Sequence, residues 1–380
     1  REEKNMLMAA SGSVLKPFLR DRFLHLLILL GVILTLFQPE KISRFPQFVD
    51  WDTIVTLLGL LMLTKGVEVS GYFDFVGRKM INAIDNERRL ALFLVTAAAL
   101  LSTFMTNDVA LFIVIPLTIT LKKLTSLPVT RLIIFEALAV NAGSLLTPIG
   151  NPQNILLWNK SGQSFLHFIG QMAPLALITL VALLLVTWFC FPSHSLKKIE
   201  NNQGYPFRKR LLVSCVVLYV VFIACVDLGL ALYGLLAVIL CFLLLARNVL
   251  LRIDWPLILV FIVMFIDVRL LVGLNALQPA FNHIHSLPDY GHYLLSIGLS
   301  QVISNVPATI LMINYLPSGP LLAYAVNAGG FGLAIGSLAN LIALRMANDK
   351  KIWLQFHYYS FPFLLFSVIT GWLLLTLFIK

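Results

Sequence analysis

The sequence predicts an all-α polytopic membrane protein that consists of two inverted repeats, with about nine spanning helices and two re-entrant hairpins. Three observations support this fold class: the high content of apolar residues, the polar interruption of two long apolar segments, and the gathering of basic residues in alternate loops. The chain has 380 residues, of which 59% are hydrophobic and 12% are charged, and its mean hydropathy is +0.89. Soluble domains contain about 45–50% apolar and about 25% charged residues. A water-soluble fold is therefore excluded.

Spanning helices are expected where about 20 mostly apolar residues occur together. The first apolar segment, 23–37, is not followed by a small-residue cleavage site, so we interpret it as a spanning helix rather than a signal peptide. Two segments, 90–121 and 293–316, contain polar residues at mid-length and are too short for two spans and too long for one, which predicts re-entrant hairpins. The expected spans are 23–38, 51–70, 131–158, 165–191, 211–226, 229–246, 256–273, 320–344 and 356–379.

The loops between these elements differ in charge, although the chain as a whole has a net charge of +10. Segments 274–292 and 317–319 contain no Lys or Arg. By the positive-inside rule the basic loops face the cytoplasm, which places the N-terminus inside and the C-terminus outside. Opening either hairpin into two spans would put basic loops on both faces. Basic residues in short loops are topology signals, so we do not expect nucleic-acid binding. The basic loops are 1–22, 71–90, 122–131, 192–210, 247–255 and 345–355.

Short motifs recur in the two halves of the chain. The order span, hairpin, broken span and final span also recurs, with the first broken span running outward and the second inward, so the repeats are inverted. The predicted division is a cytoplasmic segment at 1–22, a first half at 23–191, a linker loop and connecting helix at 192–228, and a second half at 229–380. The matched motifs are Asp50-Trp51 with Asp254-Trp255, Asn107 with Asn305, and, at an offset of 186, Asn141-Ala142-Gly143 with Asn327-Ala328-Gly329, Ile149-Gly150 with Ile335-Gly336, and Asn154 with Asn340.

Four segments, 102–108, 141–154, 300–309 and 327–340, combine Gly or Pro with Ser, Thr and Asn in the middle of apolar sequence. Broken helices in hydrocarbon persist only when they are buried in protein or line a polar cavity. Half-helix N-termini attract an anion, and freed carbonyl oxygens suit Na+. Small polar residues also mediate helix packing in membranes, but their pairing by the repeat favours a binding site. The candidate substrate- and ion-binding residues are Ser102, Thr106, Asn107, Asp108, Asn141, Gly143, Thr147, Gly150, Asn151, Asn154, Ser300, Ser304, Asn305, Thr309, Asn327, Gly329, Gly336, Ser337 and Asn340, with Na+ expected near Asn107, Asp108 and Gly150.

Motifs for other chemistry do not occur in the sequence. Cys190, Cys215, Cys225 and Cys241 lie singly in apolar segments without a CxxC or Cys/His spacing, so we expect neither disulfides nor a transition-metal site. The sequence contains no Ser/His/Asp set, zinc motif or nucleotide-binding loop. We therefore expect no enzyme and no cofactor, apart from a coupling ion, Na+ or H+.

The segments MTNDVALFIVIPLTI and GSLLTPIGNPQNIL resemble the ion transporter superfamily. This superfamily includes divalent-anion/sodium symporters, citrate transporters, arsenite efflux pumps and a group of sodium/proton antiporters. The chain most resembles enterobacterial inner-membrane proteins of the citrate-transporter-like anion permease group, over nearly all residues beyond 15. The resemblance implies a homodimer with a scaffold and a moving transport domain, and elevator-type alternating access in the bacterial inner membrane.

The hairpin tips carry a more specific part of this resemblance. In dicarboxylate members of the superfamily, Ser-Asn-Thr at each tip binds substrate carboxylate and sodium. Here Thr106 precedes Asn107 at the first tip and Ser304 precedes Asn305 at the second, so both Asn residues and Ser304 match. Asp108 and Val306 occupy the Thr positions. The Asn-Asp pair is more similar to the arsenite-pump branch.

Asp108 is the most specific candidate for ion coupling. An ionisable residue in the middle of a membrane is costly and is a functional candidate by default. It could bind Na+ directly, or carry a proton in response to burial. The alternative is an N-cap of a half-helix spanning 109–121, because Asp is a favoured capping residue.

Other charged residues in apolar segments have a simpler explanation. Lys65 with Glu68, Asp267 with Arg269, and Glu136 are expected to form ion pairs or to extend to the membrane interface. Segment 71–89 alternates apolar and basic residues, which predicts an amphipathic helix on the inner membrane surface.

These observations predict a secondary transporter of a small inorganic or carboxylate anion or oxyanion, coupled to Na+ or H+, with its site at the hairpin tips and broken helices. A Na+/H+ antiporter with Asp108 as the shared ion site, and a metalloid (arsenite-type) efflux protein, are alternatives. From a different class, a channel would not require the repeat symmetry. The expected partners are the transported anion, membrane lipids and a second copy of the chain.

Overall fold

The computed structural model describes residues 15–199 and 206–378, which form α-helices and short 3-10 helices joined by loops. No β-strand occurs in this part of the chain, where isolated bridges pair Asn86 with Ser195 and Thr125 with Lys198. The prediction of an all-α protein is confirmed. The predicted segment 1–22 falls mostly outside the described residues, as does residue 379 at the end of the last expected span.

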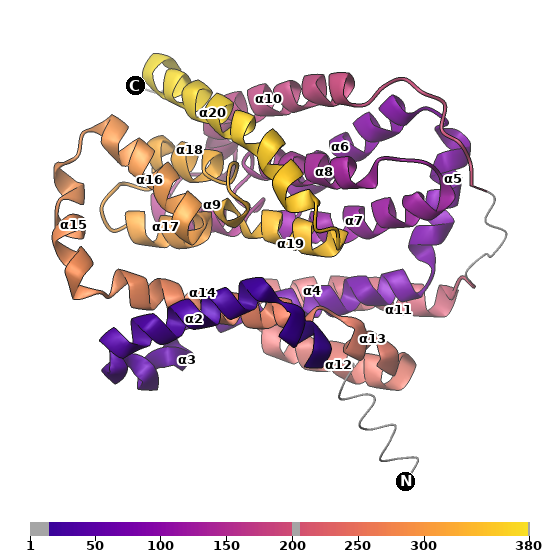
Figure 1. The fold of residues 1–380 in the computed structure, drawn as a ribbon, viewed down its shortest axis with the longest axis horizontal. Helices are drawn as coiled ribbons and strands as arrows, with labels where there is room; N and C mark the ends of the chain where they lie inside the picture. The colour runs from indigo at the N-terminus through magenta and orange to yellow at the C-terminus, as the bar shows by residue number, and fades with distance from the viewer. Residues whose placement is uncertain (1–14, 200–205, 379–380) are drawn as a thin grey trace, which may run out of the picture. The chain divides into compact units, whose positions relative to one another are not determined.

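Two compact units divide the described residues, and each unit combines chain from both predicted repeat halves. Unit 1 comprises residues 15–72 and 206–282, and unit 2 comprises residues 73–199 and 283–378. The two halves predicted from the sequence repeat differ from these two units, which are defined by contacts. The division into repeat halves stays a prediction. The helices of unit 1 are α2 (Arg22–Phe37), η1 (Pro39–Arg44), α3 (Phe45–Phe48), α4 (Trp51–Val69), α11 (Lys209–Asp227), α12 (Ala231–Leu245), α13 (Arg247–Arg252), α14 (Trp255–Val272), η2 (Asn275–Leu277) and α15 (Gln278–Asn282) (Figure 1).

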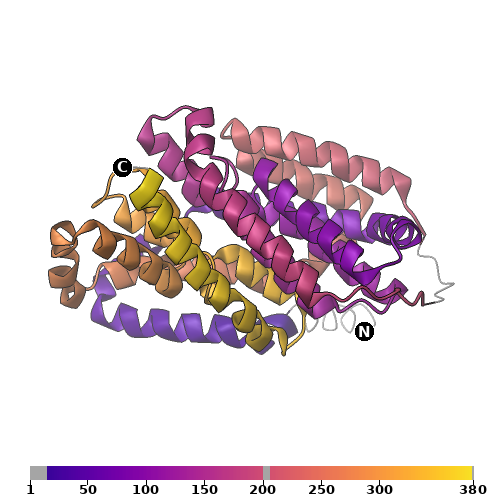
Figure 2. The same ribbon diagram turned by 90° about the horizontal axis from the view of Figure 1, so that it is seen from above.

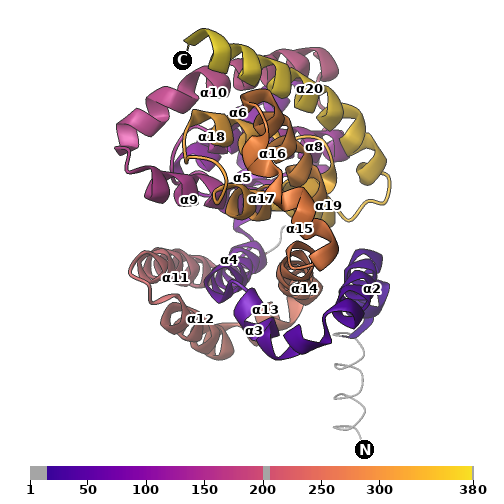
Figure 3. The same ribbon diagram turned by 90° about the vertical axis from the view of Figure 1, so that its left-hand side faces the viewer.

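Within unit 1, α2 packs against α14, and α4 packs against α11 and α12 (Figure 3). Gly66 allows one of these close approaches. A Cβ at this position would lie 2.6 Å from the ring of Phe242 on α12 and 2.7 Å from Cys215 Sγ on α11. Because interiors are close-packed, a larger side chain at residue 66 would separate the three helices.

The recurring Asp-Trp motif has one structural role in both places. Asp50 and Asp254 are the N-caps of α4 and α14, and each carboxylate accepts a hydrogen bond from the backbone N–H three residues later, at 3.3 and 3.1 Å. The indole N–H groups of Trp51 and Trp255 each donate to the carbonyl five residues earlier, at 2.7 and 2.9 Å. Asp is a favoured N-cap residue, so the motif sets where each helix begins.

Unit 2 is organised around α8 (Val129–Ser144), in which every residue from 132 to 144 is buried. This helix packs against α6, α7, α10, α19 and α20. Figure 2 shows α20, in yellow, beside α10, in magenta, and the two helices are in contact. The other helices of unit 2 are α5 (Tyr72–Ala83), α6 (Glu87–Phe104), α7 (Asn107–Leu124), α9 (Pro152–Ser161), α10 (Phe165–Cys190), η3 (Ile284–Ser286), α16 (Asp289–Ile303), α17 (Asn305–Met312), α18 (Pro320–Ala328), η4 (Ala334–Gly336), α19 (Leu338–Ala347) and α20 (Ile352–Phe378).

Four helices in the described residues, α10, α11, α14 and α20, are long and apolar enough to cross a membrane. The number is six if two bent pairs each form one span: α2 with Pro39–Phe48, bent by 119°, and α4 with α5, bent by 62°. The sequence predicts about nine spans. The difference arises because α8–α9 and α18–α19 are interrupted, and because α12 has only 15 residues.

The interruptions occur where the polar motifs predict them. The first expected hairpin consists of α6 and α7, broken at residues 105–106, and the second consists of α16 and α17, broken at Ser304. The two helices of each pair pack against each other. That they enter and leave the membrane on one side stays a prediction, as does the inverted orientation of the repeats.

Helix α5 has the amphipathic pattern expected for segment 71–89. Phe73, Gly77 and Ile81 are its buried residues, and their spacing of four places them on one helix face. Arg78 on the same helix makes an ion pair with Asp74, with Nε 3.0 Å from Oδ2. The helix therefore buries one face in unit 2 and presents polar groups elsewhere.

Candidate functional site

The first core break, residues 145–151, separates α8 from α9 and frees carbonyl groups from helical hydrogen bonding. Asn154 satisfies three of them, because its Nδ2 donates to the carbonyls of residues 144, 145 and 147 at 3.3, 3.2 and 3.1 Å. Asn151 caps α9, and its Oδ1 accepts from the backbone N–H of Asn154 at 2.9 Å. Unpaired backbone groups are costly away from water, so these two side chains stabilise the break.

The second core break, residues 329–337, separates α18 from α19 and has the same arrangement. Asn340 Nδ2 donates to the carbonyl of Gly330 at 2.8 Å, and Gly330 is equivalent to residue 144 at the offset of 186. Ser337 caps α19, where its Oγ accepts from the backbone N–H of residue 339 at 3.3 Å. Gln301 of α16 donates to the carbonyls of residues 329 and 331 at 2.6 and 3.0 Å.

Four buried asparagines join the two core breaks by reciprocal hydrogen bonds. Asn141 Nδ2 donates to Asn340 Oδ1 at 2.7 Å, and Asn327 Nδ2 donates to Asn154 Oδ1 at 2.8 Å. Each of the four side chains is at most 5% exposed. At the offset of 186, Asn141 corresponds to Asn327 and Asn154 corresponds to Asn340. The two hydrogen bonds are therefore equivalent under the repeat. The two halves of the chain thus meet at this centre through equivalent contacts.

Two glycines bring α6 and α16 close to the core breaks in the same way. A Cβ at Gly143 would lie 2.5 Å from Ser102 Oγ and would overlap the carbonyl of Ala99 on α6. A Cβ at Gly329 would lie 2.7 Å from Ser300 Oγ on α16. These glycines therefore act through close packing of helices.

The first tip, residues 105–108, contacts the first core break. The backbone N–H of Asn107 donates to the carbonyl of Gly150 at 2.9 Å. Asn107 Oδ1 accepts from the backbone N–H of Asp108 at 2.9 Å, and the Asn107 side chain is buried. Thr147 Oγ1 donates to the carbonyl of Thr103 at 2.7 Å and adds a second link between these segments.

The second tip, residues 304–306, contacts the second core break. Ser304 has a φ of +75° and its Oγ is buried without a hydrogen-bond partner in the described residues. Positive φ is costly for a non-glycine residue, and such strain clusters at functional sites. Asn305 Nδ2 lies 3.3 Å from the point that a Cβ of Gly330 would occupy, and Asn141 Oδ1 lies 3.7 Å from the same point. The two tips and two core breaks therefore form one polar centre inside unit 2.

Within this centre, the predicted residues fall into two classes. The four asparagines on the helices that flank the core breaks are hydrogen-bonded to one another, and Asn154 and Asn340 also bond freed carbonyls. The hydroxyls of Ser102, Ser300 and Thr309 donate to carbonyls of their own helices at 2.8, 2.9 and 2.7 Å. At the tips, by contrast, no hydrogen bond joins the side chain of Thr106, Ser304 or Asn305 to another described residue. The tips hold the polar groups that remain available to a ligand.

Asp108 belongs to the available groups. Its side chain is half-buried, and its carboxylate makes no ion pair or hydrogen bond with the described residues. The capping interpretation is wrong, because α7 begins at Asn107 with Thr106 as its N-cap, and Asp108 lies in the first turn. A carboxylate in the first turn interacts favourably with the positive end of the helix dipole.

Three polar residues of unit 2 have larger roles than the sequence indicates. Glu136 was expected to pair or to reach the interface, but it is 0% exposed and its partner is the hydroxyl of Thr118 on α7. Gln301 bonds the second core break, and Gln153 Nε2 donates to Asn327 Oδ1 at 3.3 Å. Both glutamines lie in the polar motifs, so their position in the sequence could have identified them.

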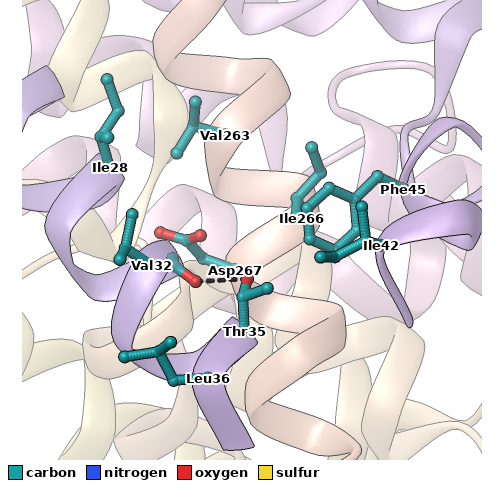
Figure 4. A pocket seen from close by; sticks show the side chains of 10 residues that line it. Ile28, Val32, Thr35, Leu36, Ile42, Phe45, Val263, Ile266 and Asp267 are labelled. Carbon is teal, nitrogen blue, oxygen red and sulfur yellow. Dashed lines mark hydrogen bonds between the residues drawn. The ribbon is translucent and has the colours of Figure 1, made fainter. Parts of the chain in front are cut away.

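Outside unit 2, Asp267 of α14 does not form an ion pair with a described residue, which was one of its two expected explanations. Its side chain is 4% exposed, and neither carboxylate oxygen has a partner in the described residues. Figure 4 shows the carboxylate against α2, beside a cavity of about 340 Å³ whose other lining residues include Ile28, Val32 and Phe45. Lys65 and Glu68, in contrast, form the expected ion pair, with Nζ 3.0 Å from Oε2.

The described residues contain no group of three or more His, Cys, Asp or Glu side chains that could hold a metal ion. Cys190, Cys215, Cys225 and Cys241 are free thiols. The three residues expected near Na+ lie together at the first tip, where the Asp108 backbone N–H donates to Asn107 Oδ1 and the Asn107 backbone N–H donates to the Gly150 carbonyl.

Comparisons with known proteins place the chain among transporters. Residues 19–320 match the family described as "Citrate transporter". The chain is 58% identical over 365 residues to Inner membrane protein YbiR of Escherichia coli, with 95% of this chain and 98% of that protein covered. It is 32% identical over 338 residues to an uncharacterised transporter of Methanocaldococcus jannaschii, covering 87% and 91%. It is 27% identical over 341 residues to an uncharacterised transporter of Mycobacterium tuberculosis, covering 79% of each.

Proposed function

The chain belongs to the citrate transporter family of membrane transporters, and from this premise we propose that it moves a small anion or oxyanion across the membrane, coupled to Na+ or H+. The reciprocal hydrogen bonds Asn141–Asn340 and Asn327–Asn154 are the observation that carries this proposal. A centre shared by equivalent segments of two repeats is the arrangement from which secondary transporters achieve alternating access. The inverted orientation of the repeats and the re-entrant hairpins are part of the proposal.

The substrate is expected at the tips, since their polar groups lack protein partners. Helices α7 and α17 begin there, and their N-termini carry partial positive charge that favours an anion. Thr106, Ser304 and Asn305 supply neutral hydroxyl and amide groups that can donate to carboxylate or oxyanion oxygens. The family's description as citrate transporters supports a carboxylate, and the amide-rich site suits an inorganic oxyanion equally.

Asp108 is the proposed contact of the coupling ion. A carboxylate beside an anion site repels the substrate unless a cation neutralises it, so binding of Na+ or H+ at Asp108 would raise the affinity for the anion. This makes the two binding events interdependent, which is the requirement for coupled transport. The equivalent residue of the second tip, Val306, cannot do this, so the coupling ion is assigned to the first half.

The cellular setting is proposed from the same relatives. The E. coli protein is named an inner membrane protein, which supports a bacterial inner-membrane location. The basic loops support a cytoplasmic N-terminus and a periplasmic C-terminus. A homodimer is proposed from the superfamily resemblance, with membrane lipids around it.

Solute uptake into proteoliposomes tests the proposal. We expect an imposed pH or Na+ gradient to drive accumulation of at least one anion from a panel of citrate, dicarboxylates, phosphate and sulfate, with neutral arsenite tested beside them. Counterflow of the same solute should occur without any gradient. Ionic currents through single molecules, with no gradient-driven uptake or counterflow of any solute, would show a channel instead.

A Na+/H+ antiporter is the second candidate, favoured by the unpaired carboxylate of Asp108. In that case Na+ and H+ would compete for Asp108, and Na+ efflux from the vesicle lumen would bring H+ inward and acidify the lumen without an anion. Metalloid efflux is the third, favoured by the Asn107-Asp108 pair, and transport of arsenite as the neutral hydroxide would identify it. Anion uptake, acidification of the lumen without an anion, and arsenite transport therefore distinguish the three candidates.

A further inference from the structure

Glu136 lies in α8, the most buried helix among the described residues, where its carboxyl group has one hydrogen-bonding partner. Thr118 Oγ1 on α7 lies 2.8 Å from Oε1 and 2.9 Å from Oε2 of this residue. Both side chains are 0% exposed. The contact joins the helix that follows the first tip to the helix that precedes the first core break.

The two short contacts indicate whether Glu136 is ionised or protonated. A threonine hydroxyl has one hydrogen and two lone pairs, and an ionised carboxylate has no hydrogen to donate. With an ionised Glu136, one hydroxyl hydrogen would serve two oxygens, both at hydrogen-bonding distance. With a protonated Glu136, the acid O–H donates to Thr118 Oγ1 while the hydroxyl donates to the other carboxyl oxygen. The second form satisfies both contacts with normal hydrogen bonds.

Burial favours the same form. An isolated charge taken out of water costs several kcal/mol unless a counter-charge is close, and no ion pair involves Glu136 in the described part of the chain. Arg131 on the same helix instead donates to the carbonyl of Cys190 at 2.8 Å. Lys122, one turn beyond Thr118, is exposed. The titratable and charged groups on the helices that pack against α8 are Glu87, Arg88 and Arg89 on α6, Asp108, Lys122 and Lys123 on α7, His167 and Cys190 on α10, Arg345 on α19, and His357, Tyr358 and Tyr359 on α20.

The repeat shows that packing alone does not require an acid at this position. The equivalent of Glu136, at the offset of 186, is Leu322 on α18, which is also 0% exposed. A leucine fills this buried position at no desolvation cost, whereas a carboxyl group needs a proton and a partner. The acid in the first half therefore has a role that its counterpart lacks, as Asp108 does beside Val306.

We propose that Glu136 and Thr118 form a proton-binding site that links α7 to α8. In the packed arrangement the site holds one proton, shared through the cyclic pair of hydrogen bonds. Loss of that proton leaves a carboxylate that requires water, so it favours an arrangement in which α7 and α8 separate enough to hydrate Glu136. Two arrangements with different proton affinities make the conformational equilibrium depend on pH. The site thus gives the proposed transporter a proton that couples to movement of the first tip, and this role rests on the proposed function.

Infrared difference spectroscopy and transport together test the inference. The protein is reconstituted in lipid, and the C=O stretch of a protonated carboxylic acid is followed from acidic to alkaline pH. The test variants are Glu136→Gln and Thr118→Val. The matched control is Thr120→Val, since Thr120 also lies on α7 and its hydroxyl donates to the Pro116 carbonyl at 2.9 Å. Counterflow and pH-driven uptake of the transported anion are measured for each.

We expect a protonated carboxyl band at neutral pH that is absent in Glu136→Gln, shifted in frequency in Thr118→Val, and unchanged in Thr120→Val. Titration of this one proton should change wild-type uptake by at most about tenfold per pH unit, and Glu136→Gln should flatten that dependence while retaining counterflow. A wild-type spectrum without the band at neutral pH, or a pH dependence that Glu136→Gln leaves intact, would overturn the inference. If no anion is transported, the proposed function fails while the infrared band still decides whether the site binds a proton.

Discussion

The reciprocal asparagine pairs lead to a quantitative prediction about the stability of unit 2. Replacing Asn340 by Ala removes the hydrogen bond to the Gly330 carbonyl at 2.8 Å and the bond from Asn141 at 2.7 Å. The truncation leaves two buried groups unpaired, the Gly330 carbonyl and the Asn141 amide, and each unpaired group costs about 1–3 kcal/mol. Since Asn141 Nδ2 retains a long contact of 3.5 Å to the Gly330 carbonyl, part of this cost is recovered. We expect the free energy of unfolding to fall by about 2–4 kcal/mol.

The pairing itself is isolated by a double-mutant cycle. Asn141→Ala, Asn340→Ala and the double variant give the coupling between the two side chains, and we expect about 1 kcal/mol, because the second truncation removes a bond that the first has already broken. The cycle on Asn327 and Asn154 should give a coupling of the same sign and similar size. Asn141 combined with Asn86, which caps α6 and shares no partner with it, is the control and should be additive.

Denaturant titration of the purified protein in mixed micelles measures these energies. If the two halves meet through equivalent contacts, both double-mutant cycles show a coupling energy. Coupling in one cycle with none in the other would refute the equivalence, even if every single variant were destabilised. A coupling in the control cycle as large as those of the pairs would show that the variants act through general loosening of unit 2.

Three further predictions concern single residues. Gly143→Ala places a Cβ 2.5 Å from Ser102 Oγ, so overpacking should lower the free energy of unfolding by about 1–3 kcal/mol, and an unchanged melting temperature would contradict the close approach. Asp267→Leu removes a buried carboxylate without partners, so the melting temperature should rise, and a fall would reveal a ligand or partner. The Lys351 N–H and the Thr130 hydroxyl lower the pKa of Asp349, so its stabilising contribution is present above the ordinary pKa of about 3.9 and is lost as the pH falls through the lowered value. Thr130→Val should reduce stability at neutral pH, and the difference from wild type should vanish in acid, as thermal unfolding across pH would show.

The positions of the helix breaks could be predicted from the sequence because Gly, Pro and Asn leave a local signal. Segment 141–154 and its counterpart 327–340 predicted interruptions, and the core breaks at 145–151 and 329–337 lie within them. The repeat offset also identified which asparagines are equivalent. It could not identify their partners, because a hydrogen bond between Asn141 and Asn340 depends on how distant segments pack.

The roles of the buried acids could not be predicted, for a related physical reason. Hydropathy places Glu136 and Asp267 in apolar segments but does not indicate which helix face is buried. A charge is costly on the buried face and tolerated on a face that reaches water. Segment 131–144 has the polar residues Arg131, Glu136 and Asn141 at intervals of five, which distributes them around the helix, so its periodicity gives no face. The capping interpretation of Asp108 failed because α7 begins two residues before the expected start at 109, a shift within the usual uncertainty of helix ends.

The division of the polar centre into bonded asparagines and available tip groups is tested most directly by the concentration dependence of transport. Counterflow of the transported anion into proteoliposomes is measured for wild type, Asn305→Ala and Asn327→Ala, together with the melting temperature of each protein. We expect Asn305→Ala to raise the KM at least tenfold with little change in melting temperature, about the effect of losing one hydrogen bond to a charged ligand. Asn327→Ala should instead lower the melting temperature. An unchanged KM in Asn305→Ala, with saturable transport retained, would contradict the placement of the anion at the tips.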